Sequence, residues 1–115
     1  MPSFRQGEIV QVPFPYTDRT TRQRRPAIVI STGNLQERHG LLWVVMITSA
    51  ENRGWANDIA IPDYEATGLP SPSVIRAAKL ATIEARDATG LGEAPAQVVE
   101  ELLAVVSRQI LGIVP

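Results

Sequence analysis

The longest apolar run in the chain is LLWVVMIT, at residues 41–48. Its aliphatic and aromatic residues favour strands, and the run is shorter than a typical globular helix. A second apolar run, PAIVI at residues 26–30, has the same character. Continuous apolar runs of this length are typical of central strands buried on both faces. Together they predict a β-sheet at the centre of the fold.

Shorter segments on either side predict further strands. Residues 8–14, EIVQVPF, are rich in β-branched residues and end at prolines, whereas residues 58–61, DIAI, alternate like a half-buried strand. Residues 73–76 and 79–84 predict either two short strands or one strand bent by a bulge. Residues 31–40 have turn chemistry and predict a loop with room for one helical turn.

The period of the pattern changes after Gly90 and Gly92. Pro95 suits a first helical turn, and apolar residues then recur at spacings of three and four, at Val98, Val99, Leu102, Leu103, Val106 and Ile110. This spacing predicts an amphipathic C-terminal helix that packs on the sheet. About five short strands followed by one helix predict an α+β, mainly β fold, built as a small, partly open antiparallel barrel.

Composition narrows the class of protein. A chain of 115 residues with 44% hydrophobic and 20% charged residues predicts a single globular domain over residues 1–115. It has no cysteine and one histidine, which excludes disulfides and thiolate or multi-histidine metal sites, so no metal or other cofactor is expected. No apolar stretch has the length of a signal peptide or a membrane span, so we expect a cytoplasmic protein without membrane contact.

Charge is distributed unevenly along the chain. The net charge is -1, but residues 1–40 hold six arginines against three carboxylates, and the remainder is acidic. Four of these arginines lie at residues 19–25, in a segment otherwise made of polar residues. Such a loop is suited to binding phosphates, although a solvated turn between strands explains the arginines equally well.

Familiar catalytic motifs are missing from the sequence. There is no glycine-rich phosphate loop and no nucleophile elbow, and a lone histidine, His39, offers little basis for a Ser-His-Asp triad. What the sequence does contain is polar residues at the ends of apolar strands, namely Arg25, Thr48 and Arg76.

Nearly the whole chain resembles the PemK/MazF-type toxins. The segments that carry the resemblance are GEIV at 7–10, FPYTD at 14–18, RRPAIVIS at 24–31, VMITS at 45–49, SVIR at 73–76 and KLATI at 79–83. The resemblance implies an SH3-like, MazF/CcdB-like barrel with a C-terminal helix. It also implies a homodimer that cuts single-stranded messenger RNA without a metal until a cognate antitoxin blocks its site.

The same resemblance assigns roles to the polar residues. Arg25 and Thr48 are implied to be catalytic, because a guanidinium can hold two phosphate oxygens in one fork and a hydroxyl can donate to the same phosphate or position the attacking 2′-oxygen. Residues implied to bind the RNA substrate are Arg24, Ser49, Arg76 and Lys79.

One position departs from the family pattern. Some members carry an aspartate two residues after the arginine that corresponds to Arg76, where it is proposed as the general base, but this chain has Ala78. We interpret His39 as a surface residue and Trp43 as a core residue. Trp55 lies in a polar loop and is the better candidate for contact with RNA or a partner protein.

Two other functions fit a barrel of this kind. The gyrase-poisoning toxin CcdB shares the fold and inhibits a protein through its C-terminal end, but residues 111–115, LGIVP, show no sign of that end. A non-catalytic SH3-like binding module would leave the pairing of Arg25 with Thr48 to chance. The sequence therefore favours a toxin of a type II toxin-antitoxin system with endoribonuclease activity.

Overall fold

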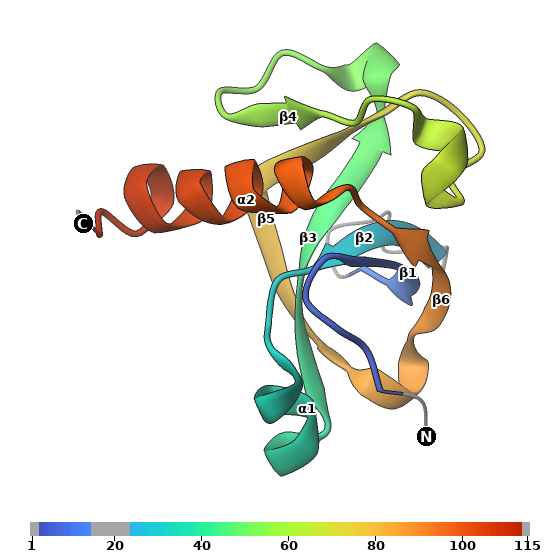
Figure 1. Cartoon of the computed structure of the whole chain (residues 1–115), viewed down its shortest axis with the longest axis vertical. Coiled ribbons are helices and arrows are strands. Elements are labelled where there is room, and N and C mark those ends of the chain that lie inside the picture. The colour runs from blue at the N-terminus through green and yellow to red at the C-terminus, as the bar shows by residue number, and fades with distance from the viewer. Residues whose placement is uncertain (1–2, 15–23, 114–115) are drawn as a thin grey trace.

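The computed structural model describes residues 3–14 and 24–113, and within them the chain forms one six-stranded antiparallel sheet (Figure 1). The strand order is β4-β5-β3-β2-β1-β6. The strands are β1 (Glu8–Pro13), β2 (Arg24–Val29), β3 (Leu41–Ser49), β4 (Asp58–Ala60), β5 (Ser73–Glu84) and β6 (Thr89–Glu93). The predicted α+β, mainly β fold with a C-terminal helix is thereby confirmed, as a strongly curved sheet whose edge strands β4 and β6 do not pair with each other.

Both faces of the sheet are buried, which explains the continuous apolar runs in β2 and β3. One face encloses a core inside the curve of the sheet that includes Phe4, Val12, Phe14, Ala27, Val29, Val44 and Met46. The other face packs against the C-terminal helix through Ile9, Ile28, Val45, Ile47, Ile75, Val98 and Leu102. Alternate residues of each strand thus serve two cores, as the period of a strand requires.

Two helices accompany the sheet. Helix α1 (Gly33–His39) ends at Gly40, whose left-handed φ of 69° lets its N–H donate to the carbonyl of Gln36. Helix α2 (Ala96–Ala104) crosses the sheet and continues as a single π-helical segment, Val105–Ile110. In Figure 1, α1 lies at one end of β3, and β4 lies near the other end. The helix at residues 33–39 is thus longer than the single helical turn expected from the sequence.

The structure decides between the two alternatives for one predicted segment and corrects two other sequence predictions. Residues 73–84 form one strand, and its register with β3 shifts between Val45 and Met46, so the bulge alternative is confirmed. Trp43 is 46% exposed, so its assignment to the core was wrong: it lies on the α2 face, beyond the part of that face that α2 covers. Residues 89–93 form the edge strand β6, where Gly90 and Gly92 had suggested only a break before the helix.

Gly92 lies in strand β6 at a point where a neighbouring segment approaches its backbone closely. A Cβ at this position would collide with the carbonyl group of Thr67, 2.7 Å from its carbon, and Thr67 lies in the short 3₁₀ turn Tyr64–Thr67. Glycine is therefore required for β6 to pack against that turn. Neither the turn nor the contact has a local sequence signal.

We predict that Gly92→Ala lowers the free energy of unfolding by about 1–3 kcal/mol, because backbone atoms cannot move aside as a side chain would. Urea denaturation measures the change. Gly33→Ala is the matched control, since a Cβ there meets nothing within 4 Å and alanine favours the helix that begins at this residue. Equal stability of the two variants would contradict the close packing of β6.

Candidate active site

The two residues implied to be catalytic lie on the same face of neighbouring strands. Arg25 pairs with Val12 of β1, and the ladder between β2 and β3 ends with Ala27 opposite Met46. Arg25 and Thr48 are the next residues along β2 and β3 that point to this face. The face is the one that encloses the core inside the curved sheet, opposite to the face covered by α2.

Arg25 and Thr48 differ in their surroundings. The half-buried Arg25 side chain makes no hydrogen bond or ion pair within residues 3–14 and 24–113. Thr48 is only 5% exposed, and its Oγ1 accepts a hydrogen bond of 3.0 Å from the side-chain amide of Asn52. Because Oγ1 is the acceptor in that bond, the hydroxyl proton of Thr48 is left to donate to another group.

Arg76 extends the same face on β5, but its guanidinium is already engaged. It pairs with Met46 on one side and with Asp58 of β4 on the other. Its Nη2 lies 3.0 Å from Asp58 Oδ2 and 2.6 Å from the carbonyl oxygen of Asn52, and its Nε donates to Asp58 Oδ1 at 3.2 Å. The two side chains are 7% and 9% exposed, so they form a buried ion pair.

The ion pair changes the chemistry of Asp58. Burial alone raises the pKa of this carboxyl, but the hydrogen bonds and charge of Arg76, with backbone N–H donors from Trp55 and Gly54, lower the pKa below its ordinary value. Asp58 is therefore ionised at neutral pH and a weak proton acceptor. The arrangement also favours a positioning role for Arg76, because two of its three nitrogens bond to Asp58 and to the Asn52 carbonyl.

The other predicted substrate-binding residues lie in three different places. The exposed Arg24 donates to the Gln11 carbonyl at 2.7 Å and to Thr89 Oγ1 at 3.0 Å, so its guanidinium lies over β1 and β6, away from β3. The Ser49 hydroxyl accepts from the Glu51 N–H and begins the 3₁₀ turn Ala50–Asn52. Lys79 lies in the bulge of β5, next to the exposed Ala78.

The structure thus brings Thr48, Arg76 and the Ala50–Asn52 turn together and separates Arg24 from them. Sequence reasoning missed Asn52 and Asp58, because neither a loop asparagine nor the first residue of a short strand carries a motif. The predicted basic loop, with Arg19 and Arg22, falls on residues 15–23, outside the described residues. In the described parts of the chain, no three acidic or histidine side chains cluster as metal ligands would.

No helix within residues 3–14 and 24–113 combines the length and apolar character needed to cross a membrane.

Solved structures share this fold over the full length of the chain. The MazF structure (Form-I) from Deinococcus radiodurans is 26% identical, with a TM-score of 0.79 over 98% of this chain and 100% of that chain. The MazE-MazF structure (Form-II) from the same organism is also 26% identical, with a TM-score of 0.78 over 99% and 100%. An endoribonuclease in complex with its cognate antitoxin from a mycobacterial species is 14% identical, with a TM-score of 0.74 over 100% and 99%, and supports the fold alone.

The sequence itself matches a toxin family. The profile described as "PemK-like, MazF-like toxin of type II toxin-antitoxin system" matches residues 5–110. The chain therefore belongs to the PemK/MazF family of toxins, and the resemblance drawn from its motifs is confirmed. A comparison with curated protein sequences gave no match.

Proposed function

We propose that this toxin is an endoribonuclease that cuts single-stranded messenger RNA at specific sequences, with Arg25 and Thr48 as its catalytic residues. The observation that carries the proposal is the placement of Arg25 and Thr48 together. A guanidinium without a partner among the described residues and a hydroxyl oriented by Asn52 point to one face of adjacent strands. Membership of the PemK/MazF family favours this reaction over the CcdB-like alternative.

The chemistry proceeds by attack of the RNA 2′-oxygen on the adjacent phosphorus. A bond forms between the 2′-oxygen and phosphorus, and the bond from phosphorus to the 5′-oxygen breaks. The products are a 2′,3′-cyclic phosphate and a 5′-hydroxyl. Arg25 stabilises the extra negative charge of the phosphorane, and the Thr48 hydroxyl donates a hydrogen bond to a phosphate oxygen.

Proton transfer is assigned to water in this proposal. The 2′-hydroxyl must lose a proton, and the leaving 5′-oxygen must gain one. Ala78 supplies no carboxylate, and the Asp58 carboxylate is held by Arg76 at a pKa below its ordinary value. Water at the exposed side of the site therefore accepts the first proton and supplies the second.

The remaining predicted residues take supporting roles. Lys79 and Ser49 flank the Thr48 end of the site and contact the RNA backbone, whereas Arg24 binds RNA that extends toward β1 and β6. Arg76 acts on the RNA indirectly, by holding the Asn52 carbonyl and thereby the loop that orients Thr48.

The whole chain, residues 1–115, acts in this proposal as one domain in the cytoplasm, without a cofactor. It forms a homodimer and is blocked by a cognate antitoxin protein. The MazE-MazF structure from D. radiodurans is the precedent for a toxin of this family bound to a second protein. The direct test is to offer the purified chain one RNA sequence as a single strand and as a duplex. Cutting of the single strand alone is expected, and equal cutting of both would contradict the proposal.

We predict that Ala78→Asp increases the cleavage rate roughly a hundred-fold, because a positioned general base contributes at least that much. Ala78 is exposed, so the new carboxylate has no burial to overcome. Single-turnover cleavage near neutral pH measures the rate. Ala78→Asn, with nearly the same shape and no base, should behave like the original chain. If Ala78→Asp is no faster, another group takes the proton.

A further inference from the structure

Trp55 presents a fixed aromatic surface beside the proposed active site. Its side chain is 48% exposed, which is unusual for an indole because it is large and apolar. Two cationic groups lie within reach of the ring: Arg76 Cζ is 4.3 Å and Lys79 Nζ 5.1 Å from its centre. Both distances are within the range of cation–π attraction.

The loop that carries Trp55 is held by hydrogen bonds of its backbone. The N–H groups of Gly54 and Trp55 both donate to Asp58 Oδ2, at 3.3 and 3.2 Å. The same oxygen accepts from Arg76 at 3.0 Å. The indole is thus positioned before any ligand arrives, which reduces the entropy that binding would cost.

The same loop also orients the proposed catalytic hydroxyl. Asn52 donates through its side chain to Thr48 and accepts through its carbonyl from Arg76. Arg76 in turn lies against the Trp55 ring. Two hydrogen bonds and one ring contact therefore connect Thr48 to the indole, through Asn52 and Arg76.

We propose that Trp55 is a nucleobase subsite, on which a base flanking the cleaved phosphate stacks. This inference rests on the proposed RNA cleavage and adds a specificity-determining residue to it. Every base has a π face that can stack on an aromatic side chain, and a single strand leaves its bases unstacked for this purpose.

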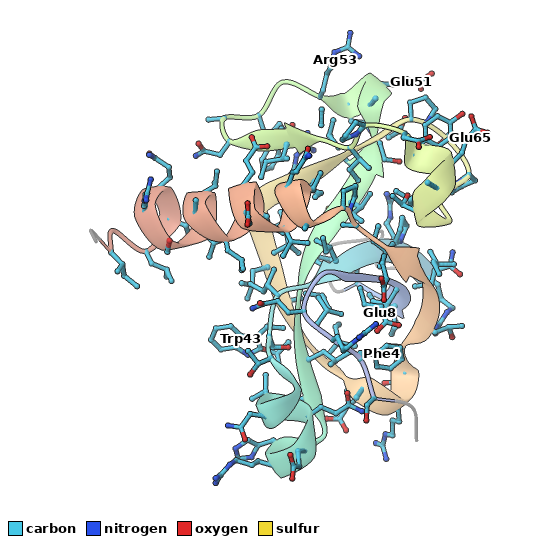
Figure 2. All side chains as sticks on the ribbon, in the orientation of Figure 1. Phe4, Glu8, Trp43, Glu51, Arg53 and Glu65 are labelled. Atoms are coloured by element: carbon cyan, nitrogen blue, oxygen red, sulfur yellow. The ribbon has the colours of Figure 1, made fainter. Side chains whose placement is uncertain are left out.

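Trp43 provides a matched control. It is the other tryptophan of the chain and is equally exposed, at 46%. Figure 2 shows Trp43 beside the sheet below α2, far from Glu51 and Arg53 of the loop that leads to Trp55. A general effect of an exposed indole would appear at both positions, whereas stacking at the active site would appear only at Trp55.

The first measurement is tryptophan fluorescence. The RNA is an oligonucleotide that the original chain cuts, with a 2′-deoxy nucleotide at the mapped cleavage position to prevent the reaction. With Trp43→Phe, in which Trp55 is the remaining indole, we expect saturable quenching by this RNA. With Trp55→Phe, in which Trp43 remains, we expect no quenching. Quenching of Trp43 alone, or of neither indole while the RNA binds, would overturn the subsite.

The second measurement compares the RNA affinity of variants, with the same uncleavable oligonucleotide. Trp55→Ala removes the stacking surface and should weaken RNA binding about ten- to hundred-fold. Trp55→Phe and Trp43→Ala should retain most of the affinity. An RNA with an abasic residue at the stacked position should bind the original chain only as tightly as it binds Trp55→Ala.

The outcomes separate this inference from the function on which it rests. If the original chain cuts RNA but Trp55→Ala cuts and binds equally well, the subsite is wrong and the nuclease proposal stands. If Trp55→Phe is as impaired as Trp55→Ala, the residue supports the loop and does not stack a base. If the original chain neither binds nor cuts RNA, both proposals fail.

Discussion

Arg25→Ala is expected to reduce RNA cleavage about a hundred- to thousand-fold while leaving the fold intact. Removal of one preorganised donor to a transition-state charge has an effect of this size. The fold should survive because the half-buried Arg25 side chain makes no hydrogen bond or ion pair with the described residues, 3–14 and 24–113. Single-turnover cleavage measures the loss, and urea denaturation checks the stability.

Two further variants sharpen this test. Arg25→Lys keeps the charge but loses the planar fork, so it should recover little of the activity. Arg38→Ala is the control, because Arg38 is an exposed arginine on α1 that bonds to Asn34 and lies outside the proposed site. Arg25→Ala with undiminished cleavage, or Arg38→Ala with an equal loss, would show that Arg25 does not act on the phosphate.

The buried ion pair gives the largest expected effect on stability. Asp58→Ala should lower the free energy of unfolding by about 3–5 kcal/mol, because it leaves the Arg76 guanidinium buried without its carboxylate. Replacing both residues, as Asp58→Leu with Arg76→Met, should be less harmful than Asp58→Ala alone. Asp87→Ala is the surface control and should change stability by less than about 0.5 kcal/mol. Equal stability of Asp58→Ala and Asp87→Ala would contradict the ion pair.

The contribution of the pair should also depend on pH in a defined direction. The pKa of Asp58 is lower in the folded protein than its ordinary value of 3.8. The unfolded chain therefore takes up this proton first as pH falls, so the stabilisation is complete above the ordinary pKa and is lost below it. The stability difference between the original chain and Asp58→Asn should shrink as pH falls below about 4. A difference that grows on acidification would contradict this sign.

Much of the fold follows from periodicity in the sequence. The runs at 26–30 and 41–48 predict central strands because both faces of the sheet are buried, and the spacing from Val98 to Val106 predicts the helix that covers one face. Strand β6 was missed because Gly90 and Gly92 resemble a break, and the reason for Gly92 is a contact with Thr67, far away in the sequence. Trp43 was misassigned because a strand pattern does not say how much of a sheet face a helix covers.

The site was predictable only in part. The resemblance named Arg25, Thr48 and Arg76 from strand ends, and the register between β2, β3 and β5 places these three on one face. What Arg76 contacts there depends on β4, which puts Asp58 beside it, and on the loop that brings the Asn52 carbonyl to it. Such contacts join residues distant in sequence, and no local pattern encodes them.

The central claim, that this toxin cuts single-stranded RNA with Arg25 and Thr48, is tested most directly by incubating the purified chain with a mixed single-stranded RNA, with and without a chelator, and determining the end groups of the fragments. We predict equal cutting in both samples, with 2′,3′-cyclic phosphate and 5′-hydroxyl ends, and cutting slowed about a hundred-fold or more for Arg25→Ala or Thr48→Ala. Intact RNA, cutting that chelation abolishes and a divalent metal restores, or fragments with 5′-phosphate ends would contradict it.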